Sequence, residues 1–280
     1  VTATVTCTTD NFTVGGSVSG LAGSGLTLQI NGGDTISLVG DGNFTFPNPL
    51  PDLSPYAVTV ATQPSQPSQT CSVSNGSGAL AGANVTNVTV SCTTNEFTVG
   101  GSVSGLAGSG LTLQVNGGDT IGLIGDGNFT FPNPLPDLSP YVVTVATQPS
   151  QPNQTCSVSN GNGTLAGANV TNVTVICTND EFTVGGSVSG LAGSGLTLKV
   201  NGGDTIGLVG DGNFTFPNPL PDLSPYVVTV ATQPSQPNQT CSVSNGSGTL
   251  AGANVTNVIV ICTTNQYAIG GEIFGLDGAS

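Results

Sequence analysis

The chain has 280 residues with one Lys, no Arg, no His and 15 acidic residues, which gives a formal net charge of −14. Nucleic-acid binding is excluded because it needs several Lys or Arg side chains to neutralise phosphates, and binding to anionic membranes is excluded likewise. No run of 18 apolar residues occurs, so no membrane insertion is predicted for this segment. The hydrophobic content of 36% argues against a disordered polyelectrolyte.

An internal repeat of 85 residues organises the sequence. The motif "FTVGGSVSG" begins at Phe12, Phe97 and Phe182, and a looser version begins at Tyr267. This period is too long for a solenoid and suits a small autonomous β domain. The predicted boundaries are 1–9 for the end of a preceding repeat, 10–94 for repeat 1, 95–179 for repeat 2, 180–264 for repeat 3, and 265–280 for the start of a following repeat. The chain is therefore interpreted as a window on a longer array.

The first half of repeat 1 predicts a series of short strands. Residues 12–18 form a strand in which two glycines mark a bulge or a close approach. Residues 26–30 alternate apolar and polar side chains, which is typical of a half-buried strand. The "NGG" turn at 31–33 leads into a returning strand at 35–39, and "GDGN" at 40–43 is a second turn.

The second half continues the same pattern. A short strand is expected at 44–46, and the proline-rich segment 47–55 cannot be a central strand because Pro donates no ladder hydrogen bond. A strand follows at 56–62, and 63–69 is expected to be extended and polyproline-like. Residues 70–92 are expected to close the repeat as a hairpin. No segment has helical periodicity, so an all-β sandwich is predicted.

Two stretches carry a family resemblance. The pattern "VGGSVSGL…LTLQI…GDGNFTFPNPLPDLSPYAVTV" resembles the carboxypeptidase-regulatory-like and CnaB-like sandwiches, which have a transthyretin-type Ig-like fold. The cysteine-bearing end resembles tandem repeats of very large bacterial surface proteins. The resemblance implies extracellular stalks, adhesins or fibres. The Lys–Asn isopeptide bond common in CnaB domains is not expected, because the only Lys is Lys199 and its equivalents are Gln29 and Gln114.

The seven cysteines predict one disulfide in each repeat. Their separations alternate between 64 and 21 residues, and the preferred pairing joins the cysteines that are 21 apart. The predicted pairs are Cys71–Cys92, Cys156–Cys177 and Cys241–Cys262, while the partner of Cys7 is expected outside this window. Pairing of the Cys7–Cys71 type in a different frame is the alternative. Zinc is disfavoured because there is neither C-x-x-C nor His. Disulfides indicate an oxidising compartment.

The acidic and glycine-rich motifs carry little chemistry. "GLAGSG", which begins at Gly20, lacks the spacing of a phosphate loop and is interpreted as a turn of small residues. The aspartates of repeat 1 are scattered over turns and do not form the facing pair that glycoside hydrolysis needs. No metal site is predicted, although interdomain calcium at the junctions is weighed as a minor alternative. Its weak candidates are Asp10, Glu96, Asp180 and Glu181.

Several Asn-x-Ser/Thr sequons are candidate glycosylation sites. The main ones are Asn43, Asn75, Asn128 and Asn213. In a bacterial chain their origin in composition alone is the favoured interpretation, whereas in an archaeal chain it is not. One tyrosine follows "LSP" in each of the three repeats. These tyrosines are expected in the core rather than on a sugar-binding surface.

The sequence therefore predicts a non-enzymatic protein without a cofactor, because no His or partner Lys is available to activate a nucleophile. We expect a structural segment of an extracellular or cell-surface fibre, filament or stalk. Its partners would be further copies of the repeat in the same chain, and self-assembly into a filament is a further prediction. The alternative is an adhesin whose repeats bind a glycan or a surface ligand directly.

Overall fold

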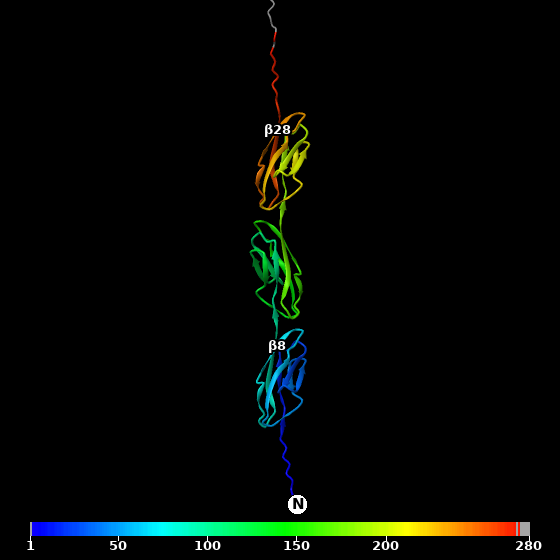
Figure 1. The fold of residues 1–280 in the computed structure, drawn as a ribbon, viewed down its shortest axis with the longest axis vertical. Coiled ribbons are helices and arrows are strands. Elements are labelled where there is room, and N and C mark those ends of the chain that lie inside the picture. Colours follow the sequence, from blue (N-terminus) through cyan, green and yellow to red (C-terminus); the bar gives the residue numbers. More distant parts are fainter. Residues whose placement is uncertain (1, 273, 275–280) are drawn as a thin grey trace, which may run out of the picture. The chain divides into compact units, whose positions relative to one another are not determined.

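The computed structural model describes residues 2–272 and 274, and these residues form thirty strands and no helix (Figure 1). The strands fall into three sets of ten, one set in each predicted repeat, and each set makes an Ig-like β-sandwich. The prediction of an all-β tandem array with one disulfide per domain is confirmed.

Repeat 1 consists of two four-stranded sheets and one pair of very short strands. The first sheet has the order β5-β2-β10-β8 and the second has the order β4-β3-β7-β9, while β1 pairs with β6. Their bounds are β1 Asn11–Phe12, β2 Val14–Ser19, β3 Leu26–Ile30, β4 Thr35–Leu38, β5 Gly42–Thr45, β6 Leu50–Pro51, β7 Pro55–Thr62, β8 Gln69–Ser74, β9 Ser77–Ala79 and β10 Val85–Thr94.

The other two repeats have the same sheet orders. Repeat 2 contains β11 Glu96–Phe97, β12 Val99–Ser104, β13 Leu111–Val115, β14 Asp119–Leu123, β15 Gly127–Thr130, β16 Leu135–Pro136, β17 Pro140–Thr147, β18 Gln154–Ser159, β19 Asn162–Thr164 and β20 Val170–Asn179. Repeat 3 contains β21 Glu181–Phe182, β22 Val184–Ser189, β23 Leu196–Val200, β24 Asp204–Leu208, β25 Gly212–Thr215, β26 Leu220–Pro221, β27 Pro225–Thr232, β28 Gln239–Ser244, β29 Ser247–Thr249 and β30 Val255–Thr264.

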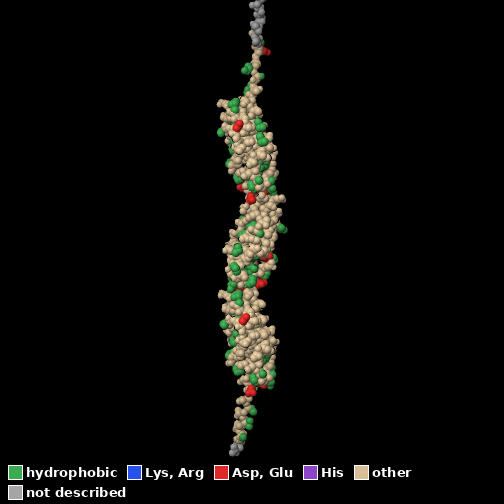
Figure 2. Space-filling model, turned by 180° about the vertical axis from the view of Figure 1, so that it is seen from behind, with side chains coloured by type: hydrophobic (Ala, Val, Ile, Leu, Met, Phe, Trp, Pro, Cys, Tyr) green, Lys and Arg blue, Asp and Glu red, His purple; other side chains and the backbone are tan. Residues whose placement is uncertain are grey.

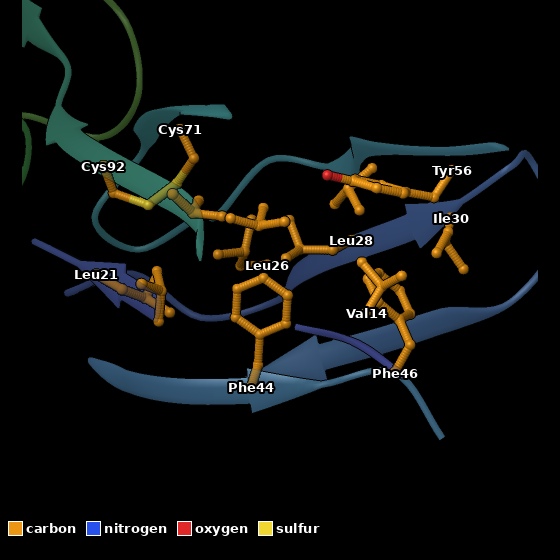
Figure 3. Packing of buried hydrophobic residues seen from close by; sticks show 14 of the residues in the cluster. Val14, Leu21, Leu26, Leu28, Ile30, Phe44, Phe46, Tyr56, Cys71 and Cys92 are labelled. Carbon is orange, nitrogen blue, oxygen red and sulfur yellow. A yellow bond between two sulfur atoms is a disulfide. The ribbon is translucent and has the colours of Figure 1, made fainter. Parts of the chain in front are cut away.

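The core of repeat 1 lies between the two sheets, where alternate side chains of longer strands such as β3, β7 and β10 are buried (Figure 3). Leu26 and Leu28 of β3 are completely buried. Phe44 and Phe46 face this layer, with ring centroids 6.0 Å apart and rings nearly perpendicular. Tyr56 is also buried, as are its counterparts in repeats 2 and 3. The period-2 pattern of the sequence thus maps directly onto burial.

The two glycines of "VGG" let backbones approach closely. In β2, a Cβ added to Gly16 would overlap the carbonyl oxygen of Val88, and one added to Gly15 would overlap the carbonyl oxygen of Phe44. Gly16 lies where β2 pairs with β10 in parallel, beside a register shift between Val85 and Val88. The expected close approach is therefore present.

The predicted closing hairpin at 70–92 is wrong in one respect. Strands β8 and β10 are antiparallel neighbours, but the chain crosses to the other sheet between them and forms β9 against β7. The crossing starts at Asn75, which has a φ of 55°, and ends at Leu80, whose side chain is buried in the core. Burial of this leucine explains why the segment joins the second sheet.

The predicted polyproline-like segment at 63–69 is also wrong, because it contains a turn. The Gln66–Pro67 peptide bond is cis and Gln66 has a φ of 57°. The turn is fixed by two backbone hydrogen bonds between Ser24 and Ser65, of 2.9 and 2.8 Å. We call residues 65–68, and the equivalent residues 150–153 and 235–238, the Gln-Pro loop.

Each repeat contains one disulfide. The bonds join Cys71 to Cys92, Cys156 to Cys177 and Cys241 to Cys262. In repeat 1 the two cysteines lie directly opposite each other on β8 and β10. Cys7 is an exposed free thiol in the part of the chain that the structure describes.

The chain packs as two compact units. The first unit holds repeat 1 and most of repeat 2, and the second holds repeat 3 together with residues 106–110, 148–156 and 177–179. Each unit contains one junction between consecutive repeats.

Candidate functional site: the junction between repeats

The junction in the first unit is built on a proline-rich turn of repeat 2. Pro136 ends β16 and Pro140 begins β17, so the three residues between them form a tight turn. The Ser139 amide donates to the Pro136 carbonyl at 3.1 Å, and Leu138 has a φ of 63°. The prolines limit the backbone to this path and place Asp137 at the tip of the turn.

The other side of the junction is the Gln-Pro loop of repeat 1. Gln69, at the end of this loop, is only 2% exposed, and its side chain holds the loop to the body of the repeat. Its Oε1 accepts the amides of Ala22 and Gly23 at 2.9 and 2.7 Å, and its Nε2 donates to the Gly20 carbonyl at 2.8 Å. The end of the Gln-Pro loop is therefore fixed to the glycine-rich segment that begins at Gly20.

Asn95 connects the two sides through its backbone. Its amide donates to the Ser68 carbonyl at 2.9 Å, and its own carbonyl accepts the Asp137 amide at 2.9 Å. Its side chain adds a 2.7 Å bond from Thr70 and a 2.6 Å bond to the Ser68 hydroxyl. The linker residue is thus hydrogen-bonded to both repeats.

The Asp137 carboxylate completes the junction. Its Oδ2 accepts the Ser68 amide of repeat 1 at 2.6 Å, and its Oδ1 accepts the Gly167 amide of repeat 2 at 2.8 Å. The side chain is only 7% exposed. The amide of Ser68, and then that of Gly167, lower the pKa of Asp137, and these effects outweigh the desolvation that would raise it.

The second unit repeats this arrangement. Asp222 accepts the Asn153 amide at 2.7 Å and the Gly252 amide at 2.8 Å, and its side chain is 6% exposed. The linker residue is Asp180, whose amide donates to the Asn153 carbonyl at 2.9 Å and whose carbonyl accepts the Asp222 amide at 2.8 Å. The Asn153 amide is the main cause of the lowered pKa of Asp222.

Repeat 1 carries the same turn at Asp52. Asp52 accepts the Gly82 amide at 2.8 Å, as Asp137 accepts that of Gly167. Among the residues that the structure describes, no amide of another repeat reaches Asp52. The neighbouring Leu53 is 76% exposed, whereas Leu138 is 44% exposed.

A hollow lies beside each of the two junctions. The hollow in the first unit has a volume of about 230 Å³, and the one in the second unit about 400 Å³. The only ionisable side chains that line them are Asp137 and Asp222, respectively, and both carboxylates already accept two backbone amides. The arrangement is therefore suited to holding two backbones together rather than to moving protons.

The calcium candidates are not gathered into one site. Asp10, Glu96 and Glu181 are exposed. Asp180 belongs to the junction, where its Oδ1 accepts a hydrogen bond from Thr155 at 2.7 Å. Within residues 2–272 and 274, no three Asp, Glu, Cys or His side chains lie close enough together to hold a metal ion.

The candidate glycosylation sites all lie on exposed positions. Asn43, Asn128 and Asn213 occupy the same place on the edge strands β5, β15 and β25. Asn75 sits at the chain crossing after β8 and donates to the Asn87 carbonyl at 3.3 Å.

The glycine-rich loop "GLAGSG" has its backbone amides occupied by side chains of the same repeat. The Gly20 and Leu21 amides donate to Asp41 at 3.0 and 2.7 Å, and the next two amides donate to Gln69. These roles of Gln69, Asp41 and Asp137 were not predicted from the sequence. The only available signal was that a Gln or Asp recurs at each of these positions in every repeat.

Comparisons with known proteins support the fold. No protein-family model and no curated protein matches the sequence. The Bacillus anthracis TIE protein is similar in structure, with a TM-score of 0.52, 10% identity, and coverage of 90% of this chain and 51% of that protein. The chain thus spans about half the length of that protein.

Two further similar structures score lower. They are two B repeat units of the Staphylococcus aureus collagen-binding protein Cna and BcpA, the major pilin subunit of Bacillus cereus. The Cna repeats have a TM-score of 0.25 and 14% identity, and the match covers 91% of this chain and 75% of that one. BcpA has a TM-score of 0.28 and 8% identity, and the match covers 91% of this chain and 96% of that one.

In the described part of the chain, no helix is long and apolar enough to cross a membrane.

Proposed function

We propose that the chain is a structural segment of an extracellular fibre, filament or cell-surface stalk. The observation that carries this proposal is the junction, where the linker residues Asn95 and Asp180 are each hydrogen-bonded to the repeats on both sides. A linker with so few free backbone groups resists bending and separation more than a flexible linker does. The proposal includes the repeat boundaries given above and further copies of the repeat as partners.

The chemistry of the chain supports a location outside the cell. The disulfides need an oxidising compartment to form and persist. The surface is poor in charge, and the face seen in Figure 2 carries mostly uncharged polar side chains and backbone with scattered carboxylates. With Lys199 as the only Lys or Arg, the chain also offers a single site to trypsin-like proteases.

Direct adhesion is the second candidate. The hollows beside Asp137 and Asp222 favour it, because they recur in both units and would give a ligand more than one place to bind. Against it, Tyr56, Tyr141 and Tyr226, which could form a sugar-binding platform in each repeat, are buried. Adhesion at the hollows would therefore depend on polar and aliphatic side chains, such as those of Leu138 and Leu223.

Immunogold electron microscopy of intact, unpermeabilised cells of the source would test the structural role. Antibodies against the repeat should label filaments or stalks outside the cell, and purified chain should bind no glycan or matrix protein saturably on an array. Labelling confined to the cell interior would contradict the location. Saturable binding to one ligand would favour the adhesin instead.

A further inference from the structure

One aspartate recurs in all three repeats but has different partners. Asp52, Asp137 and Asp222 each follow "LP" and precede "LSP". All three accept one amide from a glycine in their own repeat, at 2.8 Å. Only Asp137 and Asp222 accept a second amide, which comes from the Gln-Pro loop of the preceding repeat.

We propose that the carboxylates of Asp137 and Asp222 couple the stability of each repeat to that of the repeat before it. The interaction surface is the end face formed by the aspartate turn, and its partner is the Gln-Pro loop of an adjacent repeat of the same kind. The coupling would exist whether the repeats form a structural stalk or bind a ligand, so it does not depend on the proposed structural role.

A carboxylate suits this position because it accepts two hydrogen bonds and donates none. Each oxygen of Asp137 has one backbone amide, one from each repeat, and the group is nearly buried. Separation of the repeats would leave the Ser68 amide without its charged partner. Hydrogen bonds to a charged group are stronger than those between neutral groups, so the contact favours the closed junction.

The amides of the Gln-Pro loops provide an internal comparison. The Ser68 and Asn153 amides donate to carboxylates of the next repeat. The equivalent amide in repeat 3 belongs to Asn238, and among the described residues it has no acceptor. Coupling should therefore protect the first two amides from exchange with solvent and leave the third unprotected.

The test is amide hydrogen exchange, followed by NMR on the full chain, in three matched variants. Asn has one acceptor oxygen and one donor NH₂. We expect Asp137→Asn and Asp222→Asn to keep the bond to the glycine of their own repeat, as at Asp52, and to lose the bond to the preceding repeat, whereas Asp52→Asn keeps its single bond to Gly82. Far-UV circular dichroism and the mass of the oxidised chain would show that each variant is folded with its disulfides.

In the unmodified chain, the Ser68 and Asn153 amides should exchange about tenfold or more slowly than the Asn238 amide. Asp137→Asn should raise the exchange rate of the Ser68 amide to that of the Asn238 amide and leave the Asn153 amide unchanged. Asp222→Asn should raise the exchange rate of the Asn153 amide and leave the Ser68 amide unchanged. Asp52→Asn should change neither amide.

Two results would overturn the proposal. One is equal exchange at Ser68, Asn153 and Asn238 in the unmodified chain. The other is an Asp52→Asn variant that loses as much stability as Asp137→Asn, since the bond within a repeat would then account for the whole effect. Neither result bears on whether the chain lies outside the cell, so the structural role is tested separately.

Discussion

Gln69 is a buried amide side chain with both ends hydrogen-bonded. It serves three backbone groups of the glycine-rich loop at once. A buried backbone donor without a partner is costly, so this one side chain fixes the loop and the Gln-Pro loop beside it.

Replacing Gln69 with Ala should destabilise repeat 1 by about 2–4 kcal/mol, because the Ala22 and Gly23 amides lose their acceptor. The measurement is denaturant unfolding of the full chain, where the lowest transition should move to lower denaturant. Gln29→Ala is the control, since Gln29 bonds only to the Thr59 hydroxyl at an exposed site. Equal effects of the two substitutions would contradict the assigned role.

Acid should weaken the junctions. The pKa of Asp137 and that of Asp222 are lowered in the folded chain, so their stabilisation is fully present above the unfolded-state pKa of about 4 and is lost as the pH falls through the folded-state values. The melting temperature should therefore decrease once the pH is lowered below about 4.

The matching variant for this prediction is Asp137→Asn combined with Asp222→Asn. Its melting temperature should fall less between neutral pH and pH 3 than that of the unmodified chain, while Asp52→Asn should keep most of the original fall. An unchanged pH dependence in the double variant would show that other carboxylates cause the effect.

At the scale of elements, the parallel pairing of β2 with β10 depends on Gly16. A side chain there would meet the backbone of Val88, which cannot move without breaking the pairing. Gly16→Ala should therefore cost at least about 2 kcal/mol in unfolding free energy.

Gly33→Ala is the control for that substitution. A Cβ at Gly33 would meet only the Ile30 carbonyl oxygen, at 3.8 Å, which is an ordinary contact. This variant should unfold within about 0.5 kcal/mol of the unmodified chain. If Gly16→Ala were as stable as Gly33→Ala, the close approach would not be required.

The strands were predictable because alternation reports burial directly, as in Leu26, Leu28 and Ile30. Strand β9 was not, because "SGA" carries no alternation and forms a strand only when β7 is beside it. The turn at Gln66–Pro67 likewise depends on Ser24, which is 41 residues away from its partner Ser65. Contacts between distant residues decide these segments.

The junction was predictable only in part. Acidic residues were expected at the junctions, as weak calcium candidates. The local sequence around Asp137 could not show its contact with repeat 1, however, because its partner Ser68 is 69 residues away.

At the scale of the whole molecule, each repeat is closed by its own disulfide. Replacing Cys71 and Cys92 with Ser should destabilise repeat 1 by about 3 kcal/mol, because the unfolded chain regains the freedom of a loop of 21 residues. Denaturant unfolding of the full chain would measure this loss. Cys7→Ser is the control and should leave stability unchanged, since Cys7 is an exposed free thiol.

A structural role requires each repeat to resist tension as a separate folded unit, closed by its own disulfide. Single-molecule pulling of the full chain from its two ends measures this resistance. We expect three unfolding events of similar length, and each should lengthen by about 70 Å after reduction, because the segment between two cysteines that are 21 positions apart becomes extensible. Extension without discrete events would show that the repeats do not resist tension separately, and events whose length is unchanged by reductant would show that the disulfides do not close them.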